Sequence, residues 1–114
     1  VAGTNNDAFD NTKLGMEMSL AKNFVATKGL PLYIVKSAVD GTAITQWTSP
    51  NTNFSNLSDA IQRAVQAIED SGSVCKPVAF IWYQGEADAL NSTEAAAYAT
   101  RLQQFIGNVN GIYG

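Results

Sequence analysis

The chain of 114 residues contains no histidine and only one cysteine, and both shortages restrict its chemistry. Without an imidazole, the commonest general base near neutral pH is missing, so these residues alone cannot assemble a Ser-His-Asp or Cys-His nucleophile arrangement. Cys75 by itself cannot close an intramolecular disulfide or form a Cys-ligated zinc site. We therefore expect no metal site, and any such hydrolytic chemistry must be completed by residues outside the chain.

Positive charge is also scarce, since 7 Lys and Arg stand against 10 Asp and Glu and give a formal net charge of −3 at pH 7. No cluster of basic residues marks a surface for nucleic-acid phosphates or for an anionic membrane. Long apolar runs are missing too, because none approaches the roughly 20 residues that a membrane-spanning helix needs. These absences predict one small domain with no nucleic-acid partner and no membrane contact.

Three segments have the hydrophobic period of amphipathic helices. The first covers residues 13–28. The second lies between Asn56, which would cap it, and Gly72, and the third lies between Asn91, another capping residue, and Gly111. Each segment places its apolar residues on one helical face, so we expect three helices that pack on a core.

Two continuous apolar runs predict strands between these helices. They are Leu32–Val35, continuing to about Val39, and Val78–Trp82. Continuous apolar runs are typical of parallel strands that are covered on both faces. The alternation of helices and strands therefore predicts an α/β three-layer sandwich with a parallel sheet. Because a two-stranded parallel sheet buries too little surface to stand alone, further strands are expected outside the chain.

Residues 1–12 and residues 40–56 have no hydrophobic period and predict irregular loops. The second is long for a compact domain, and loops of that length are usually functional. It follows the first predicted strand, while a short acidic turn follows the second. Because ligands of open parallel sheets bind at the carboxyl ends of the strands, we expect the loops after both strands to form one rim. The candidate residues on this rim are Asp40, Gly41, Trp47, Gln84, Glu86 and Asp88.

The loop segments resemble those of SGNH hydrolases, in the sialate O-acetylesterase-like branch of the carbohydrate esterases. The segment Trp82–Asp88 reads WYQGEAD and is similar to the W-x-Q-G-E-x-D block of that branch. Residues 34–42, with Trp47 downstream, resemble a family segment that consists of a hydrophobic strand, Gly-Gly-Thr and then Trp. Residues 15–18, GMEM, resemble the start of the helix that carries Gly-x-Glu-Leu. The three segments occur in the family's order.

This resemblance implies a flavodoxin-like three-layer fold and the hydrolysis of an ester, typically an O-acetyl group on a sugar. In the family, a Ser on an early turn attacks the acyl carbon and a C-terminal His acts as the base, and neither has a match here. Residues 1–114 would then be one partial domain, the central segment of such an esterase, with the Ser and His segments before and after it. The resemblance implies no cofactor and favours a secreted or periplasmic location.

The resemblance also assigns roles by position. Gln84 would be a side-chain donor to the tetrahedral oxyanion, and the backbone at Asp40 and Gly41 would supply an N–H group. Asp40 stands where the family has Gly, and its charge would oppose an oxyanion unless it points away or pairs with a cation. The residues expected to line the substrate rim are Trp47, Glu86 and Asp88.

Each candidate also has a plainer interpretation. Gln84 could finish a strand and bond to a loop backbone, Asp-Gly is a common turn dipeptide, and the acidic residues could cap a turn. Trp47 could cover the edge of the core. If Asp40 disables the oxyanion site, the chain would be a degenerate SGNH-like domain that binds carbohydrate or serves a structural role in a secreted or virion protein. A third alternative is a flavodoxin-like signalling or nucleotide-binding module. Glu86 argues against it, because its carboxylate would stand where a phosphate would bind.

Overall fold

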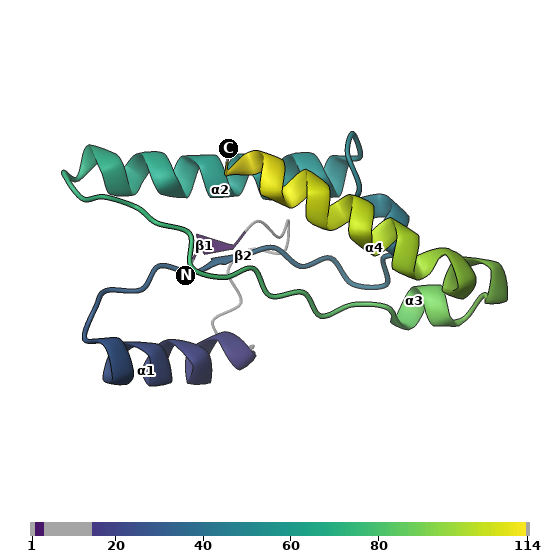
Figure 1. Cartoon of the computed structure of the whole chain (residues 1–114), viewed down its shortest axis with the longest axis horizontal. Helices are drawn as coiled ribbons and strands as arrows, with labels where there is room; N and C mark the ends of the chain where they lie inside the picture. Colours follow the sequence, from purple (N-terminus) through teal and green to yellow (C-terminus); the bar gives the residue numbers. More distant parts are fainter. Residues whose placement is uncertain (1, 4–14, 114) are drawn as a thin grey trace. The chain divides into compact units, whose positions relative to one another are not determined.

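The computed structural model describes residues 2–3 and 15–113, and it divides into two compact units, residues 1–38 and residues 39–114 (Figure 1). Most of the described residues are helical. The elements in chain order are β1 (Ala2–Gly3), α1 (Met16–Lys28), β2 (Val35–Lys36), the 3-10 helix η1 (Ile44–Trp47), α2 (Thr52–Asp70), α3 (Glu86–Ala89) and α4 (Ser92–Ile112).

The predicted flavodoxin-like, three-layer α/β sandwich is wrong for this structure. Strand pairing in the described residues is limited to β1 and β2, which run parallel with Ala2 opposite Val35 and Gly3 opposite Lys36. The second predicted strand, Val78–Trp82, is extended but is not part of a sheet. A strand needs a neighbour that exchanges backbone hydrogen bonds with it, and hydrophobicity alone does not supply one. β1 also lies within the segment that was expected to be irregular.

In the first unit, α1 ends as predicted. Gly29 adopts the left-handed conformation, with φ of 64°, and its N–H donates to the Val25 carbonyl at 2.9 Å. The expected start, residues 13 and 14, lies outside the described residues. No residue of α1 is buried, so the predicted apolar face forms no core within the described part of the chain.

An ion pair joins β2 to α1 in this unit. The Lys36 Nζ atom lies 2.9 Å from Glu17 Oε1. The hydrogen bond from Lys36 holds the pKa of the Glu17 carboxyl below its ordinary value, helped by hydrogen bonds from the backbone. This contact is the main polar link between sequence-distant parts of the first unit as far as it is described.

The second unit begins with a loop that is shorter than predicted. α2 starts at Thr52, so its N-cap residue is Asn51 and the expected cap, Asn56, lies inside the helix. The Asn51 Nδ2 atom donates to the carbonyls of Thr45 at 2.8 Å and Thr48 at 3.0 Å. The loop is therefore folded against the start of α2 through η1. One apolar face of α2 is buried, as predicted, and its buried residues are Leu57, Ala60, Ile61 and Ile68.

α4 begins and ends near its predicted limits. The Asn91 side chain accepts hydrogen bonds from the N–H groups of Thr93 and Glu94, which confirms the predicted cap. The Glu94 carboxylate forms an ion pair with Arg101 further along the helix. Figure 1 shows that α2 and α4 run in the same direction. The extended segment that connects α2 to α3 runs in the opposite direction.

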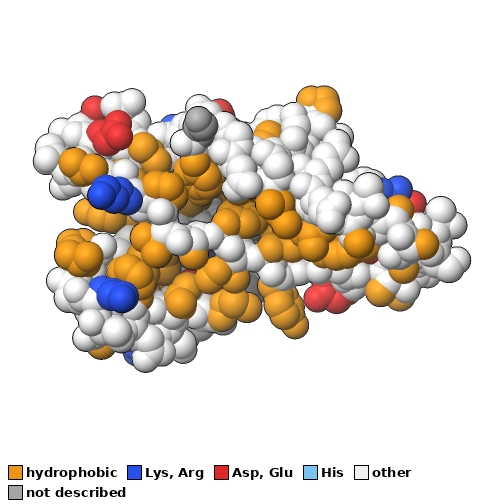
Figure 2. All heavy atoms as spheres, in the orientation of Figure 1, with side chains coloured by type: hydrophobic (Ala, Val, Ile, Leu, Met, Phe, Trp, Pro, Cys, Tyr) orange, Lys and Arg blue, Asp and Glu red, His pale blue; other side chains and the backbone are white. Residues whose placement is uncertain are grey.

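This extended segment touches the core through its aromatic side chains but is largely exposed. Phe80 and Trp82 pack on Phe105 of α4, with ring centroids 5.7 Å and 4.5 Å apart. Ile81 and Tyr83 are more exposed, at 52% and 79%, than Phe80, at 38%. Figure 2 shows apolar side chains at the surface of the molecule. The expectation that this run is covered on both faces is therefore wrong, and the core lies between its inner face and the helices.

Candidate oxyanion site

Two polar loops meet at the side-chain amide of Gln84. Its Nε2 atom donates to the backbone carbonyl of Thr42 at 2.7 Å and to Asp88 Oδ2 at 2.7 Å. Thr42 follows the Asp40-Gly41 turn and lies 42 residues before Gln84 in the sequence. The turn after the first predicted strand and the acidic turn after the second therefore lie together, although the second predicted strand, Val78–Trp82, is not part of a sheet in the described residues.

Asp88 is the buried centre of this contact. It belongs to the short helix α3, and only 1% of its surface is exposed. Its carboxylate accepts a hydrogen bond from the Ile44 N–H, with distances of 3.0 Å to Oδ2 and 3.3 Å to Oδ1. One carboxylate thus joins α3, the first residue of η1 and the Gln84 amide, which offsets the cost of burying its charge.

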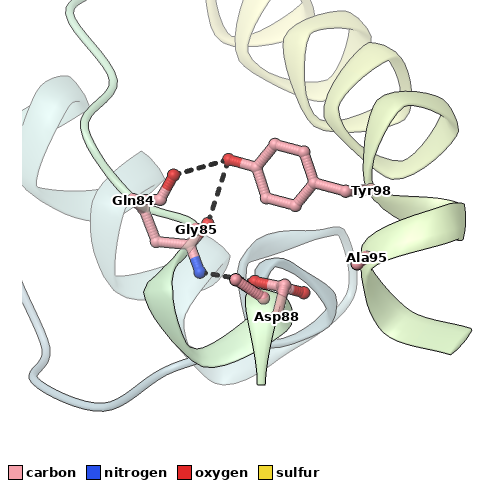
Figure 3. A pocket seen from close by; sticks show the side chains of 6 residues that line it. Gln84, Gly85, Asp88, Ala95 and Tyr98 are labelled. Carbon is pink, nitrogen blue, oxygen red and sulfur yellow. Dashed lines mark hydrogen bonds between the residues drawn. The ribbon is translucent and has the colours of Figure 1, made fainter. Parts of the chain in front are cut away.

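Tyr98 of α4 holds the opposite side of Gln84. Its hydroxyl donates to the Gln84 backbone carbonyl at 2.7 Å and lies 3.2 Å from Gln84 Oε1. The Trp82 Nε1 atom donates to the same hydroxyl at 3.3 Å. Figure 3 shows the Tyr98 hydroxyl directed at both Gln84 oxygens while the Gln84 nitrogen faces Asp88. The amide is therefore held from both ends.

Both hydrogens of the Gln84 amide are engaged in this arrangement. An amide nitrogen has two donors, and here one serves Thr42 and the other Asp88. A developing oxyanion could be bound only if one of these two hydrogen bonds were exchanged for it. In this conformation, therefore, neither N–H of the Gln84 amide is free to bind an oxyanion.

The turn before Thr42 depends on Gly41, whose φ is 65°. A β-turn with positive φ at this position favours Gly because other side chains are strained there. The Thr42 hydroxyl closes the turn by donating to the Val39 carbonyl at 2.9 Å. Asp40 is exposed, so water screens its charge. The turn therefore keeps its backbone shape while its acidic side chain remains in solvent.

Of the residues expected on the substrate rim, Trp47 is buried and Glu86 is exposed. Trp47 is only 2% exposed, its Nε1 atom donates to Thr42 Oγ1 at 2.8 Å, and its ring packs edge-on against Trp82. In this conformation the indole belongs to the core. Glu86 is exposed, and its carboxylate accepts the Gly85 N–H at 3.1 Å, so it also stabilises the turn.

A shallow pocket of about 260 Å³ lies beside the Gln84 amide (Figure 3). This volume is below the roughly 300–1,000 Å³ of typical small-molecule sites, so it suits a small substituent rather than a whole sugar ring. Its lining combines apolar methyl groups and an aromatic ring with the polar atoms of the amide network. The lining residues are Gln84, Gly85, Asp88, Ala89, Ala95 and Tyr98.

The family model described as carbohydrate esterase, sialic acid-specific acetylesterase matches residues 3–111. The chain belongs to this carbohydrate esterase family. A probable carbohydrate esterase of Arabidopsis thaliana is 30% identical over 88 residues, which cover 77% of this chain and 32% of that protein. The chain thus spans about a third of the length of this curated relative. No solved structure matches it. The predicted resemblance to the sialate O-acetylesterase-like carbohydrate esterases is confirmed.

Two members of the hydrogen-bond network around Gln84 were missed by sequence reasoning. Tyr98 lies in the segment between Asn91 and Gly111, which was predicted only as an amphipathic helix. A phenol hydroxyl on an apolar face usually needs a hydrogen-bond partner, and that requirement was the available signal. Thr42 contributes a backbone carbonyl, which carries no side-chain signal. Over residues 2–3 and 15–113, no group of three or more metal-ligating side chains occurs, and no helix is long and apolar enough to cross a membrane.

Proposed function

We propose that this chain is the oxyanion-binding segment of a carbohydrate O-acetylesterase. The observation that carries the proposal is the 2.7 Å hydrogen bond from Gln84 Nε2 to the carbonyl of Thr42. It brings the amide of the matched W-x-Q-G-E-x-D block against the turn that contains Gly41, the two segments expected to hold the oxyanion. The family membership supports ester hydrolysis, and an acetylated carbohydrate is the substrate class that we propose.

The chemistry would follow acyl transfer through a tetrahedral intermediate. A serine hydroxyl from another part of the esterase attacks the acetyl carbonyl carbon, a histidine there takes the hydroxyl proton, and the carbonyl oxygen becomes negatively charged. The Gln84 side-chain N–H and the Gly41 backbone N–H would donate to this oxygen. Preorganised donors of this kind are worth about 3–4 kcal/mol each in the transition state.

The hydrogen bond that Gln84 would release is the one to Thr42. A hydrogen bond to a neutral carbonyl is weaker than one to a carboxylate, so the bond to Asp88 would persist while the other N–H turns to the oxyanion. The neighbouring pocket, lined by Ala89 and Ala95, would take the small acetyl methyl group. Asp40 and Glu86, both exposed, would lie on the substrate rim and accept hydrogen bonds from sugar hydroxyls.

The deciding experiment is Gln84→Ala in the complete esterase that carries these residues. We expect kcat to fall about 100-fold with little change in KM, because the interaction forms only in the transition state. Gln62→Ala, which removes an exposed glutamine of α2, is the matched control and should have the wild-type rate. A wild-type kcat for Gln84→Ala would remove Gln84 from the mechanism.

A second experiment tests whether the nucleophile and its base lie outside residues 1–114. Residues 1–114 contain no histidine, so this chain alone should not hydrolyse p-nitrophenyl acetate above the buffer rate. Restoration of activity by the complete protein under the same conditions is the control. Turnover by the purified 114-residue chain would contradict the proposal that the nucleophile and its base come from elsewhere.

A degenerate carbohydrate-binding domain is the second candidate, because Asp40 stands where the family carries Gly. In that case the complete protein would bind an acetylated sugar without hydrolysing it, and Asp40→Gly should restore hydrolysis, because the Asp40 carboxylate is what would disable the oxyanion site. For an esterase, Asp40→Gly should leave kcat unchanged or raise it, since the exposed carboxylate is removed from the neighbourhood of the oxyanion. Calorimetric binding combined with an acetate-release assay separates the two functions.

A further inference from the structure

Asp88 is the one charged side chain among the described residues that is buried. Every polar contact that it makes is with a donor, namely the Ile44 N–H and the Gln84 amide. The catalytic scheme above gives it no direct contact with substrate. A buried carboxylate persists only where its partners stabilise it, so the identity of those partners indicates its role.

We propose that Asp88 is a positioning residue that sets the orientation of the Gln84 amide for oxyanion binding. This inference rests on the proposed function of Gln84. Asp88 would act through Gln84 and would not touch the substrate. The residue also supports the first residue of η1, which lies next to the turn that carries the second donor.

The amide has two possible orientations, and the network selects one. With the nitrogen toward Asp88 and Thr42, both contacts of 2.7 Å are hydrogen bonds. Rotation of the amide by half a turn would place Oε1 at the same distance from a carboxylate and a carbonyl oxygen, where like partial charges repel. It would also remove Oε1 from the Tyr98 hydroxyl, 3.2 Å away. Asp88 supplies the charged part of this selection.

The chain contains a matched pair for comparison. Gln66 and Asp70 on α2 also stand four residues apart, and their contact from Nε2 to Oδ1 measures 2.8 Å. That pair is exposed, whereas Asp88 is 1% exposed. Because water competes for the exposed contact, it should hold its amide weakly, while the buried contact should hold it strongly. The two pairs therefore separate the effect of spacing from that of burial.

The test is a double-mutant cycle in the complete esterase. Asp88→Asn keeps the shape and one oxygen but removes the charge, and we expect kcat to fall about 10-fold with KM nearly unchanged. The double variant with Gln84→Ala should be no slower than Gln84→Ala alone, about 100-fold below wild type, because Asp88 acts only through Gln84. Asp70→Asn is the control and should leave kcat at the wild-type value.

A second readout does not depend on activity. The side-chain amide protons of Gln84 should exchange slowly with solvent in nuclear magnetic resonance spectra of the wild-type esterase, and faster in Asp88→Asn. The Gln66 amide should exchange rapidly in both. Rapid exchange at Gln84 in the wild-type protein would overturn the inference even if Asp88→Asn failed to fold.

The outcomes separate the two claims. If Gln84→Ala lowers kcat but Asp88→Asn has the wild-type rate, or if their effects multiply, Asp88 is only structural and the inference is wrong. If Gln84→Ala has the wild-type rate while Asp88→Asn still releases the Gln84 amide, the esterase role of Gln84 is wrong and the orienting role of Asp88 stands. Slow exchange of the Gln84 amide protons, together with kcat effects of Asp88→Asn and Gln84→Ala that do not multiply, supports both the oxyanion role of Gln84 and the positioning role of Asp88.

Discussion

The two units of the chain use polar contacts in different ways. In residues 39–114, Asp88, Thr42 and Trp47 bury their polar atoms and pair them with one another or with the backbone. In the described part of residues 1–38, the main polar contact is the ion pair between Glu17 and Lys36, and α1 has no buried residue. The difference teaches that the energetic value of a polar contact depends on whether water can replace it. The candidate site contains the buried carboxylate of Asp88, whose hydrogen bonds water cannot readily replace.

The apolar core of the second unit should show the largest effect. Phe105 is fully buried against Phe80 and Trp82, so Phe105→Ala should lower the free energy of unfolding by about 3–5 kcal/mol. Urea unfolding followed by tryptophan fluorescence measures this unit, because Trp47 and Trp82 both belong to it. The matched control is Ile106→Ala on the same helix. Ile106 is exposed, so this substitution should lower the free energy of unfolding much less.

Asp88→Ala should have the next largest effect. The substitution leaves the Ile44 N–H and one Gln84 amide hydrogen without an acceptor, and buried donors of this kind cost about 1–3 kcal/mol in unfolding free energy. Asp70→Ala, at an exposed carboxylate, should change it by less than about 0.5 kcal/mol. Equal effects in urea unfolding for the two variants would contradict the comparison between buried and exposed polar contacts.

Trp47→Phe should have a smaller effect than either. Phenylalanine retains an aromatic ring but cannot donate to Thr42 Oγ1, so we expect a loss of about 1 kcal/mol from this hydrogen bond in addition to a packing defect. Fluorescence of Trp82 remains available to follow unfolding. An unchanged unfolding midpoint would show that the contact between the indole and the hydroxyl adds nothing to the turn.

The ion pair of the first unit should show the smallest effect. Lys36→Met should raise the pKa of Glu17 toward its ordinary value, because the hydrogen bond from Lys36 is the largest cause of its lowered pKa. The pair stabilises the unit above the ordinary pKa of Glu17, and this contribution is lost as the pH falls through the lowered value. We expect no more than about 1 kcal/mol at neutral pH, since pairs that remain partly exposed to water are weak.

That titration is measured by the carboxyl carbon resonance of Glu17 in the wild-type protein and in Lys36→Met. Lys22→Met removes a charge from the same helix and serves as the control. A Glu17 pKa that stays low in Lys36→Met would show that backbone hydrogen bonds, rather than the lysine, lower it.

The helices were largely predictable because their signals are local. Asn91 caps α4 through its own neighbours, and Gly29 ends α1 through a backbone conformation that favours glycine. The start of α2 was predicted wrongly because Asn51 provides an earlier N-cap position, and its side chain bonds to carbonyls of η1 that the sequence pattern did not indicate. The extended run around Trp82 was predicted wrongly as a sheet strand because pairing depends on a partner segment.

Composition alone determined that the chain lacks a histidine base, and the order of its motifs correctly indicated the carbohydrate-esterase family. Only the tertiary structure decided that the amide of Gln84 is held by Thr42, Asp88 and Tyr98. The physical reason is that these hydrogen bonds join residues up to 42 positions apart. Their formation depends on how η1 and α3 pack against α4, and no local pattern in the sequence contains that information.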